Sequence, residues 1–557
     1  MASLTQLKQA TLLFLIALVG LAILPLQAVV PPPPGGYPNF TTAAGDHALQ
    51  SLTSGLGNTA VGTYSMFSVT TGSYNTGVGA GALDLNTADN NTATGAAALL
   101  FNTTGTNNTA NGTAALEFNE TGSQNTATGA FALFSNTVGY GNTAVGLEAL
   151  FSNTTGITNT AIGEAALTSN TIGSYNTANG SGALLSNTTG SSNTATGVSA
   201  LFSNSEGDSN TATGGGALFL NTTGSRNTAN GAGALNTNGI GFDNTATGFN
   251  ALANNTDGTY NTASGAEALY NNTTGERNTA NGFQALTSNT TGIFNTASGE
   301  EALFSNTTGG ENPAVGFHAL YHTTVGAVNT ALGSGALDSN ITGSANVAIG
   351  YQALSHQSGG SGNIALGANA GKFVTGANNV IVIGAPGAPV SNSCFIGNIF
   401  GVTPVGQATP VVIDSNGQLG TSSSSVRFKK DIATMGKASE AILSLEPVTF
   451  HYKSDETKTP QFGLIAEEVA KVNRALVLPD EEGKPFTVRY DAVNAMLLNE
   501  FLKEHREVTE LKSTVAEQRK GMEAMAAQLK EQASQIQKVR AQLDASKPAP
   551  QVVLSVR

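Results

Sequence analysis

The stretch that decides the fold reads GAFALFSNTVGYGNTAVG and covers residues 129–146. It begins and ends on a glycine, and a glycine closing an Asn-Thr-Ala-x-Gly unit, or a close variant of it, returns about every seventeen residues. Counting from Gly62 to Gly384 gives twenty such marker glycines, and only the step from Gly79 to Gly95 departs, at sixteen. A period this regular predicts a solenoid of stacked coils rather than a globular enzyme domain.

Each coil predicts two short β-segments. Residues 142–145 alternate polar and small apolar side chains at period two, and residues 132–134 supply the bulky partners of a thin core. Glycines and Asn-Thr pairs mark the turns. The expected fold is therefore mainly β, with a narrow two-sided β-roll, or solenoid, over residues 45–400. Because so thin a roll buries little apolar surface, we expect it to pair with copies of itself.

Charge is divided unevenly along the 557 residues, whose net charge is −13. Residues 45–400 hold seventeen acidic side chains and three Lys or Arg, so this array cannot neutralise phosphates. Nucleic acid is therefore an unsuitable partner, and so is an anionic membrane surface. The one cysteine, Cys394, excludes an internal disulfide framework, and we expect it to be a small buried apolar residue.

The N-terminus has the pattern of an export signal. Lys8 precedes the apolar run of residues 11–26, which predicts a signal peptide over residues 1–28 and a Pro/Gly-rich linker over residues 29–44. The alternative is an uncleaved anchor, but the run is short for a membrane span and is interrupted by glycine and proline. We expect a secreted or cell-surface protein with no membrane span after signal removal.

Beyond the array, residues 401–423 predict a neck or linker in which Val411–Gly420 forms a strand, a tight turn and a second strand. Five motifs follow in order: SSVRFKKDI (424–432), LEPVTFHY (445–452), FGLIAEEV (462–469), VRYD (488–491) and LLNE (497–500). With this order of motifs, residues 424–505 resemble the peptidase S74 family, the intramolecular chaperone domain of phage endosialidases and tail fibres. The upstream repeats resemble the head repeats of trimeric autotransporter adhesins.

The resemblance implies a small α+β domain that folds the upstream fibre as a trimer and then cuts itself off. Its catalytic residues would be Ser424 and, five residues later, Lys429, with the scissile bond between Ser423 and Ser424. A serine hydroxyl is a poor nucleophile until a base removes its proton, and a lysine becomes that base when burial or nearby cations lower its pKa. Ser425 stands where many members of the family carry Asp, a difference that concerns cleavage efficiency more than fold.

Residues 506–545 predict a coiled coil, followed by a tail over residues 546–557. Two seams repeat every seven residues over five heptads, with glutamines at two positions that would fix the register. One seam comprises Val508, Val515, Met522, Leu529, Ile536 and Leu543, and the other comprises Leu511, Gln518, Met525, Gln532 and Val539. Three strands fit the family resemblance, although heptads of this composition do not fix the number.

These observations predict an exported, homotrimeric, adhesin-like or structural fibre, whose only enzymatic act is a single-turnover cut of its own chain. The main alternative is a non-cleaving domain that remains as a permanent trimer clamp. Two weaker alternatives are a glycan-degrading fibre and an ice-binding array. A surface or glycan ligand would be a further partner, although no residue identifies it. We expect no cofactor and no metal, because His451 and His505 lack Cys or carboxylate neighbours at ligand spacing.

Overall fold

A computed structural model describes residues 38–546 except 403, 407, 415 and 454. The predicted signal peptide, most of the linker after it and the tail beyond residue 546 lie outside these residues. The chain divides between residues 403 and 404 into two compact units, which are taken in turn. No helix within the described part of the chain is both long enough and apolar enough to cross a bilayer.

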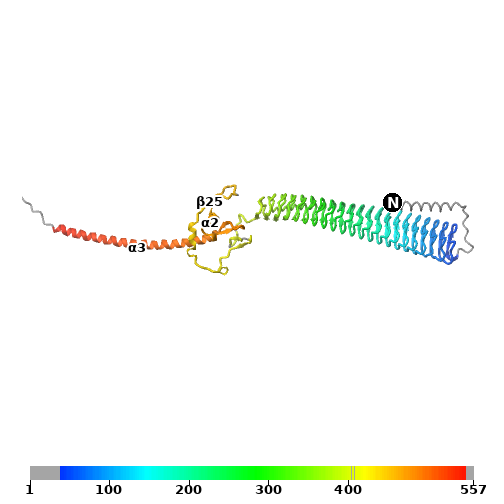
Figure 1. Ribbon diagram of the computed structural model, residues 1–557, viewed down its shortest axis with the longest axis horizontal. Helices are drawn as coiled ribbons and strands as arrows, with labels where there is room; N and C mark the ends of the chain where they lie inside the picture. Colours follow the sequence, from blue (N-terminus) through cyan, green and yellow to red (C-terminus); the bar gives the residue numbers. More distant parts are fainter. Residues whose placement is uncertain (1–37, 403, 407, 415, 454, 547–557) are drawn as a thin grey trace, which may run out of the picture. The chain divides into compact units, whose positions relative to one another are not determined.

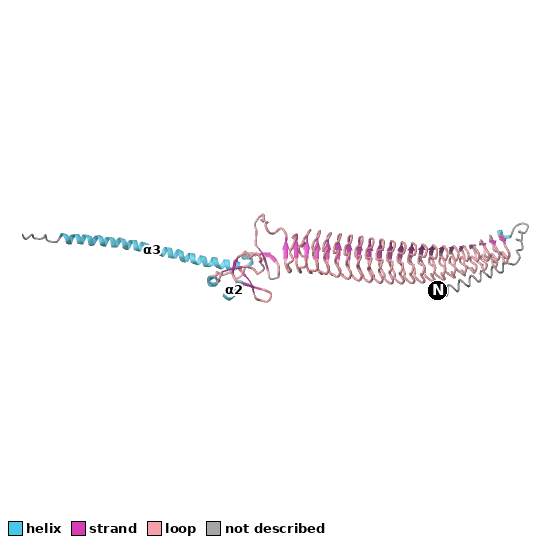
Figure 2. Cartoon of the chain, turned by 90° about the horizontal axis from the view of Figure 1, so that it is seen from above, coloured by secondary structure: helices cyan, strands magenta, loops and turns pink. Residues whose placement is uncertain are grey.

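The first unit is a solenoid in which every coil adds one three-residue strand to a single parallel sheet of 22 strands (Figures 1 and 2). After the short helical turn η1 (Pro38–Phe40), the strands are β1 (Thr42–Ala44), β2 (Thr59–Val61), β3 (Thr76–Val78), β4 (Thr92–Thr94), β5 (Thr109–Asn111), β6 (Thr126–Thr128), β7 (Thr143–Val145), β8 (Thr160–Ile162), β9 (Thr177–Asn179), β10 (Thr194–Thr196), β11 (Thr211–Thr213), β12 (Thr228–Asn230), β13 (Thr245–Thr247), β14 (Thr262–Ser264), β15 (Thr279–Asn281), β16 (Thr296–Ser298), β17 (Pro313–Val315), β18 (Thr330–Leu332), β19 (Val347–Ile349), β20 (Ile364–Leu366), β21 (Ile381–Ile383) and β22 (Cys394–Ile396).

The register of this sheet follows the sequence period. Thr211 pairs with Thr228, seventeen residues on, and the same step recurs through the array. The predicted short coil is found between Thr76 and Thr92, which are paired across sixteen residues. The last step, from Ile381 to Cys394, is thirteen. The predicted solenoid and its period are confirmed.

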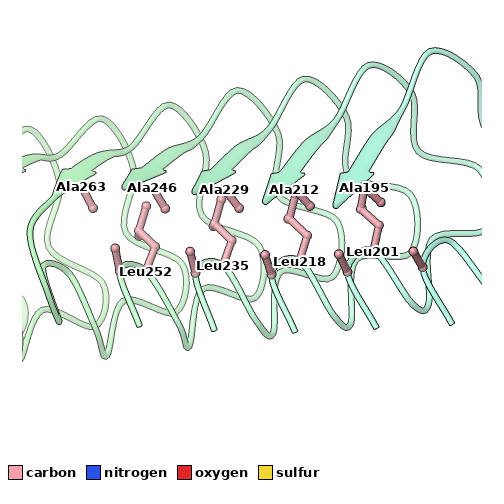
Figure 3. Packing of buried hydrophobic residues seen from close by; sticks show 14 of the residues in the cluster. Ala195, Leu201, Ala212, Leu218, Ala229, Leu235, Ala246, Leu252 and Ala263 are labelled. Atoms are coloured by element: carbon pink, nitrogen blue, oxygen red, sulfur yellow. The ribbon is translucent and has the colours of Figure 1, made fainter. Parts of the chain in front are cut away.

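The core of the solenoid is a ladder of alanine and leucine. Figure 3 shows Ala212 and Ala229 pointing inward from their strands toward Leu218 and Leu235 on the opposite side of the coil. These side chains are fully buried, and the equivalent positions are buried from coil to coil. Each coil thus closes its core against its neighbours in the same chain, and the pairing of the array with copies of itself stays a prediction.

The second β-segment expected in each coil does not form. In the coil of residues 129–145, Phe131 has φ 59° and Leu133 has φ 52°, so alternate residues adopt the left-handed conformation rather than the extended one. The segment is a compact turn whose Leu133 N–H still bonds the Ala149 carbonyl of the next coil. The fold is thus a one-sheet solenoid rather than a two-sided roll. The alternating residues 142–145 do form strand β7 (Thr143–Val145), whereas the apolar residues 132–134 carry no sequence sign that their leucine adopts a left-handed conformation.

The marker glycines are required for two reasons: their backbone conformation disfavours other residues, and the next coil leaves no room for a Cβ. From Gly45 to Gly367 they have φ between 119° and 148°, a region that residues with a Cβ rarely adopt. At Gly231 a Cβ would lie 2.3 Å from the carbonyl oxygen of Gly248 in the next coil. The seventeen-residue repeat therefore records where one coil touches the next.

Two buried ladders of asparagine hold the coils together. Asn227 donates its backbone N–H to Asn210 Oδ1 (3.0 Å) and its side-chain amide to the Gly241 carbonyl (2.8 Å). The second ladder runs through Asn238, which donates to Asn221 Oδ1 (2.8 Å) and also to Gly241 (2.8 Å). These asparagines are fully buried, so every polar group they bring into the interior must be satisfied from coil to coil.

The second unit contains short strands, short helical turns and one long helix. Its elements are the hairpin β23 (Val411–Ile413) and β24 (Leu419–Thr421), η2 (Val426–Phe428), η3 (Gly436–Ser444), the pair β25 (Val448–Phe450) and β26 (Gln461–Gly463), α2 (Ala466–Val472), η4 (Arg474–Leu476), the pair β27 (Val477–Pro479) and β28 (Pro485–Val488), and α3 (Tyr490–Ala545). The strand-turn-strand predicted for the neck is confirmed by the antiparallel pairing of Val411 with Thr421.

The core of this second unit is small. Among its described residues the buried apolar cluster comprises Val469, Leu476, Val488 and Met496. Many larger side chains are exposed instead, among them Phe462, at 81%, and Leu443, at 72%. Cys394, at the end of the first unit, is also exposed, and the expectation that it is buried is wrong. It is the first residue of β22, a position that faces solvent in β20 and β21 as well.

Candidate functional site

The site predicted from the sequence lies where β24 leads into η2. Ser424 and Lys429 are on either side of this single helical turn, and the turn brings their side chains together: Lys429 Nζ lies 3.2 Å from Ser424 Oγ. The contact has the geometry expected of a nucleophile and its base. Ser423, on the other side of the predicted scissile bond, is also exposed, and its Oγ accepts from the Ser425 N–H at 3.4 Å.

The turn itself is shaped by Ser425 and Arg427. Ser425 caps η2, because its Oγ accepts from the Arg427 backbone N–H at 3.4 Å and from Arg427 Nε at 3.2 Å. The Arg427 guanidinium also lies 5.6 Å from the centre of the Phe428 ring. Sequence reasoning gave Arg427 no role. Ser425 stands at a helix N-cap, a position that favours Asp as much as Ser. This capping role explains why Ser can stand here in place of the Asp noted in the sequence analysis.

Both members of the pair are exposed in the single chain. In bulk solvent a lysine ammonium holds its proton, and a serine hydroxyl is not activated by it. The described residues thus bring the pair into contact but leave it in water. Any chemistry at this bond requires a further surface to exclude solvent.

Two of the other motifs, FGLIAEEV and VRYD, contact each other. The Leu464 N–H donates to the Tyr490 hydroxyl at 3.0 Å, and a Cβ on Gly463 would lie 2.7 Å from the same oxygen. Arg489 Nη1 donates to the Ala475 carbonyl at 3.3 Å. The FGLIAEEV and VRYD motifs are therefore two sides of one packing contact. The glycine is needed because the tyrosine hydroxyl occupies the space of a side chain.

A polar cluster that sequence reasoning missed fastens α3 to η3. Buried Ser439 donates to Glu500 Oε1, and Asn499 Nδ2 lies 2.6 Å from Ser439 Oγ. Lys503 Nζ donates to Glu500 Oε1 at 2.7 Å and approaches Glu440 Oε1 at 3.5 Å. The hydrogen bond from Lys503, followed by that from Ser439, holds the pKa of Glu500 below its usual range. Asn499 and Glu500 are the polar half of the LLNE motif, so their role is to position α3.

The described residues contain no group of three or more His, Cys, Asp or Glu side chains placed to hold a metal ion. The candidate site therefore consists of the Ser424–Lys429 pair, together with the packing contact between Leu464 and Tyr490.

Comparison with protein-family models places residues 424–480 in a class of chaperone segments. The matching family is peptidase S74, described as the chaperone of endosialidase, and the match begins at Ser424. The resemblance inferred from the motifs is confirmed over this range. The VRYD and LLNE motifs lie beyond it, so the extension of the domain to residue 505 stays a prediction. Neither a search of curated proteins nor one of solved structures returned a match.

Proposed function

We propose that this protein is an exported, homotrimeric fibre whose C-terminal segment assembles three chains and then cuts itself off before Ser424. The single observation that carries the proposal is the 3.2 Å contact between Lys429 Nζ and Ser424 Oγ at the first residue of the family match. A serine and a lysine five residues apart are common, but here the two side chains are in contact at the first residue of the family match.

The exposed seams of α3 support three-chain assembly. Both seams predicted from the heptads are open to solvent in the single chain, with Leu511 64% and Leu529 60% exposed. An apolar stripe over five heptads is stable in water only when another helix covers it. The groove of about 420 Å³ lined by Val448, Phe462 and Leu497 is a second apolar surface in the same unit. We propose that copies of this chain cover both.

The last coils of the solenoid support the same arrangement. The third residue of each strand faces solvent, and from β9 to β16 that residue is always Asn, Thr or Ser. From β17 to β22 it is always aliphatic and 36–48% exposed: Val315, Leu332, Ile349, Leu366, Ile383 and Ile396. A trimer held at its C-terminal segments would keep three copies of this patch at high effective concentration. The solenoids would then pack together through this aliphatic patch alone and remain separate over the polar coils.

Assembly also supplies the missing condition for chemistry. Packing of three chains around residues 424–429 would exclude water from the exposed pair. Ser424 Oγ would lose its proton to Lys429 and attack the carbonyl of Ser423. The C–N bond between Ser423 and Ser424 would break as the proton held by Lys429 passes to the Ser424 amine nitrogen, leaving an ester between the Ser423 carbonyl and Ser424 Oγ. One water molecule would hydrolyse this ester to a carboxylate at Ser423 and the free Ser424 hydroxyl, which completes the single turnover. Cleavage would thus follow folding rather than precede it.

The test compares the full chain with its Ser424→Ala and Lys429→Met variants by denatured mass, N-terminal sequencing and sedimentation. We expect the wild type to yield a fragment beginning at Ser424 and both variants to stay whole while still sedimenting as trimers. An intact wild-type trimer would contradict cleavage, and a wild-type monomer would contradict the whole proposal.

The alternative with a specific observation in its favour is the permanent clamp. Ser424 and Lys429 are exposed, and Ser425 rather than Asp caps the turn between them. A domain that trimerises without burying this pair would never cut. The same experiment separates the two, because the clamp predicts an intact trimer in the wild type and in both variants.

A further inference from the structure

Departures from the repeat gather on one side of the solenoid near its C-terminal end. The residue directly after the marker glycine is aromatic at Phe249, Phe283, Phe317 and Tyr351, which are 34 residues, or two coils, apart. All four rings are 47–56% exposed. In the coils between them the same position holds Ala266, Glu300 and Ser334. The result is a row of rings at a spacing of roughly 10 Å, since neighbouring strands lie about 4.8 Å apart.

A groove of about 400 Å³ lies between the last two rings of this row. Phe317 and Tyr351 line it together with Asp338, Gln352, His356 and Lys372, all of which can form hydrogen bonds and none of which belongs to the repeat. The groove contains one carboxylate and one ammonium group, so it offers no net charge to an ionic ligand. Aromatic rings flanking a polar floor suit a ligand with apolar faces and a hydroxylated edge.

The groove is also held in place by contacts of its own. The His318 ring stacks on Phe317, with centroids 3.8 Å apart, and its Nε2 lies 2.6 Å from Glu301 Oε2. His356 Nδ1 lies 3.1 Å from the Lys372 carbonyl. A ring fixed in this way loses little conformational freedom when a ligand stacks on its open face. The site is therefore formed before any ligand arrives.

We propose that this face of the solenoid binds an uncharged, extended glycan made of β-1,4-linked hexopyranose units. In such a chain each sugar is flipped relative to the last, so every second sugar presents the same face. A row of rings on every second coil matches that alternation, while the groove's polar side chains meet the hydroxyl or acetamido groups at the edge. Cellulose-type glucans and chitin share this chemistry. The inference deepens the proposed surface fibre by naming its ligand class, and its geometry rests on the solenoid alone.

The experiment measures binding of the full chain to insoluble cellulose and chitin, and by calorimetry to cello- and chito-oligosaccharides of two to six sugars. We expect affinity to rise in steps of two sugars. Phe317→Ala and Tyr351→Ala should each weaken binding at least tenfold, and Asp338→Asn should weaken it less. The matched control is Tyr175→Ala, which removes a ring of similar exposure, 58%, from outside the row.

The proposal is overturned if neither glycan class binds, if Tyr175→Ala weakens binding as much as Tyr351→Ala, or if an anionic glycan such as alginate binds more tightly than both. Tighter binding to cellulose or to chitin shows which of the two glycans is the ligand. Circular dichroism of each variant verifies that the solenoid is intact. The same titrations on Ser424→Ala separate the two proposals, because that change affects self-cleavage and leaves the groove untouched.

Discussion

The two units of this chain solve the problem of burying apolar surface in opposite ways. In the first unit every Ala and Leu of the inner ladder is covered by the next coil of the same chain. Among the described residues of the second unit the buried apolar cluster comprises four side chains, while Phe462 and Phe486 are 81% and 73% exposed. The comparison shows that a thin solenoid can bury its apolar ladder within one chain, whereas the segment that follows it leaves large apolar side chains in contact with solvent.

The largest effect should come from filling the space between coils. Gly231→Ala puts a Cβ 2.3 Å from the Gly248 carbonyl at a backbone angle of 145°, and we expect a loss of about 4 kcal/mol from strain and overpacking together. Urea unfolding followed by circular dichroism measures it. The control is Gly215→Ala, where a Cβ meets no atom within 4 Å. Equal losses of stability in the two variants would show that the cost of replacing glycine comes from backbone propensity and not from the contact between coils.

The contrast between the units becomes sharpest when a leucine is removed from each. Leu235→Ala leaves a cavity in the closed ladder and should cost about 3 kcal/mol at every protein concentration. Leu529→Ala removes an exposed seam residue, so its effect should appear as weaker trimerisation that depends on concentration. Melting curves over a hundredfold range of concentration measure both. A concentration-dependent loss at Leu235 would mean that the solenoid core is shared between chains after all.

A smaller effect is expected from the polar ladder. Asn227→Ala leaves the Asn210 amide oxygen short of a side-chain donor and removes one of the two amides bonded to Gly241. We expect a loss of about 2 kcal/mol, the usual result of leaving buried polar groups unpaired. The exposed Asn271→Ala variant serves as control and should change stability by less than about 0.5 kcal/mol. A neutral result at Asn227 would mean that water enters the ladder.

The last effect is confined to high pH and concerns one buried carboxyl. Glu117 is 3% exposed, and burial raises its pKa to about 7. The folded state therefore holds a proton that the unfolded chain releases near pH 4.5, so stability falls as pH rises from about 4.5 through about 7. Glu117→Gln should remove this dependence and stabilise the protein at pH 8 by on the order of 2 kcal/mol.

Unfolding of Glu117→Gln and wild type at pH 5 and pH 8 measures that difference. The difference between the pH dependences of the variant and the wild type gives the contribution of Glu117 alone. It removes the contribution of Asp84, whose pKa burial raises to about 6. Glu120→Gln, on the exposed side of the same coil, is the control and should show the wild-type slope. If both variants keep that slope, the pH dependence arises elsewhere.

The sequence predicted the solenoid, its period and its short coil because all three depend on one visible constraint, the glycine at each contact between coils. It did not predict the left-handed leucines, since Leu133 looks like a strand residue and only its hydrogen bond to the next coil favours the turn. The asparagines were interpreted as turn residues binding their own backbone. Asn238 does bond nearby backbone, at Gly241 three residues on, but it also bonds Asn221, seventeen residues away, and only the closed stack brings such pairs together.

The sequence identified the residues of the candidate site but not how they are arranged in space. Ser424 and Lys429 were singled out from spacing and resemblance, and the helical turn places them in contact. The roles of Ser425, Asn499 and Glu500 could not be assigned, because each depends on a partner whose position is fixed by the fold. Asn499 and Glu500 meet Ser439 across about sixty residues of chain, a distance over which no local pattern carries information.

The hydrogen bonds of the solenoid also determine how it would respond to force. Strand and asparagine bonds run from coil to coil, along the direction in which the coils are stacked, so tension applied to the ends loads them in series. A pulled solenoid should therefore release one coil at a time, each event freeing seventeen residues and roughly 50–60 Å of extended chain. A fibre built in this way would extend in nearly equal steps, and its two shorter steps would be the sixteen-residue coil and the last, thirteen-residue one.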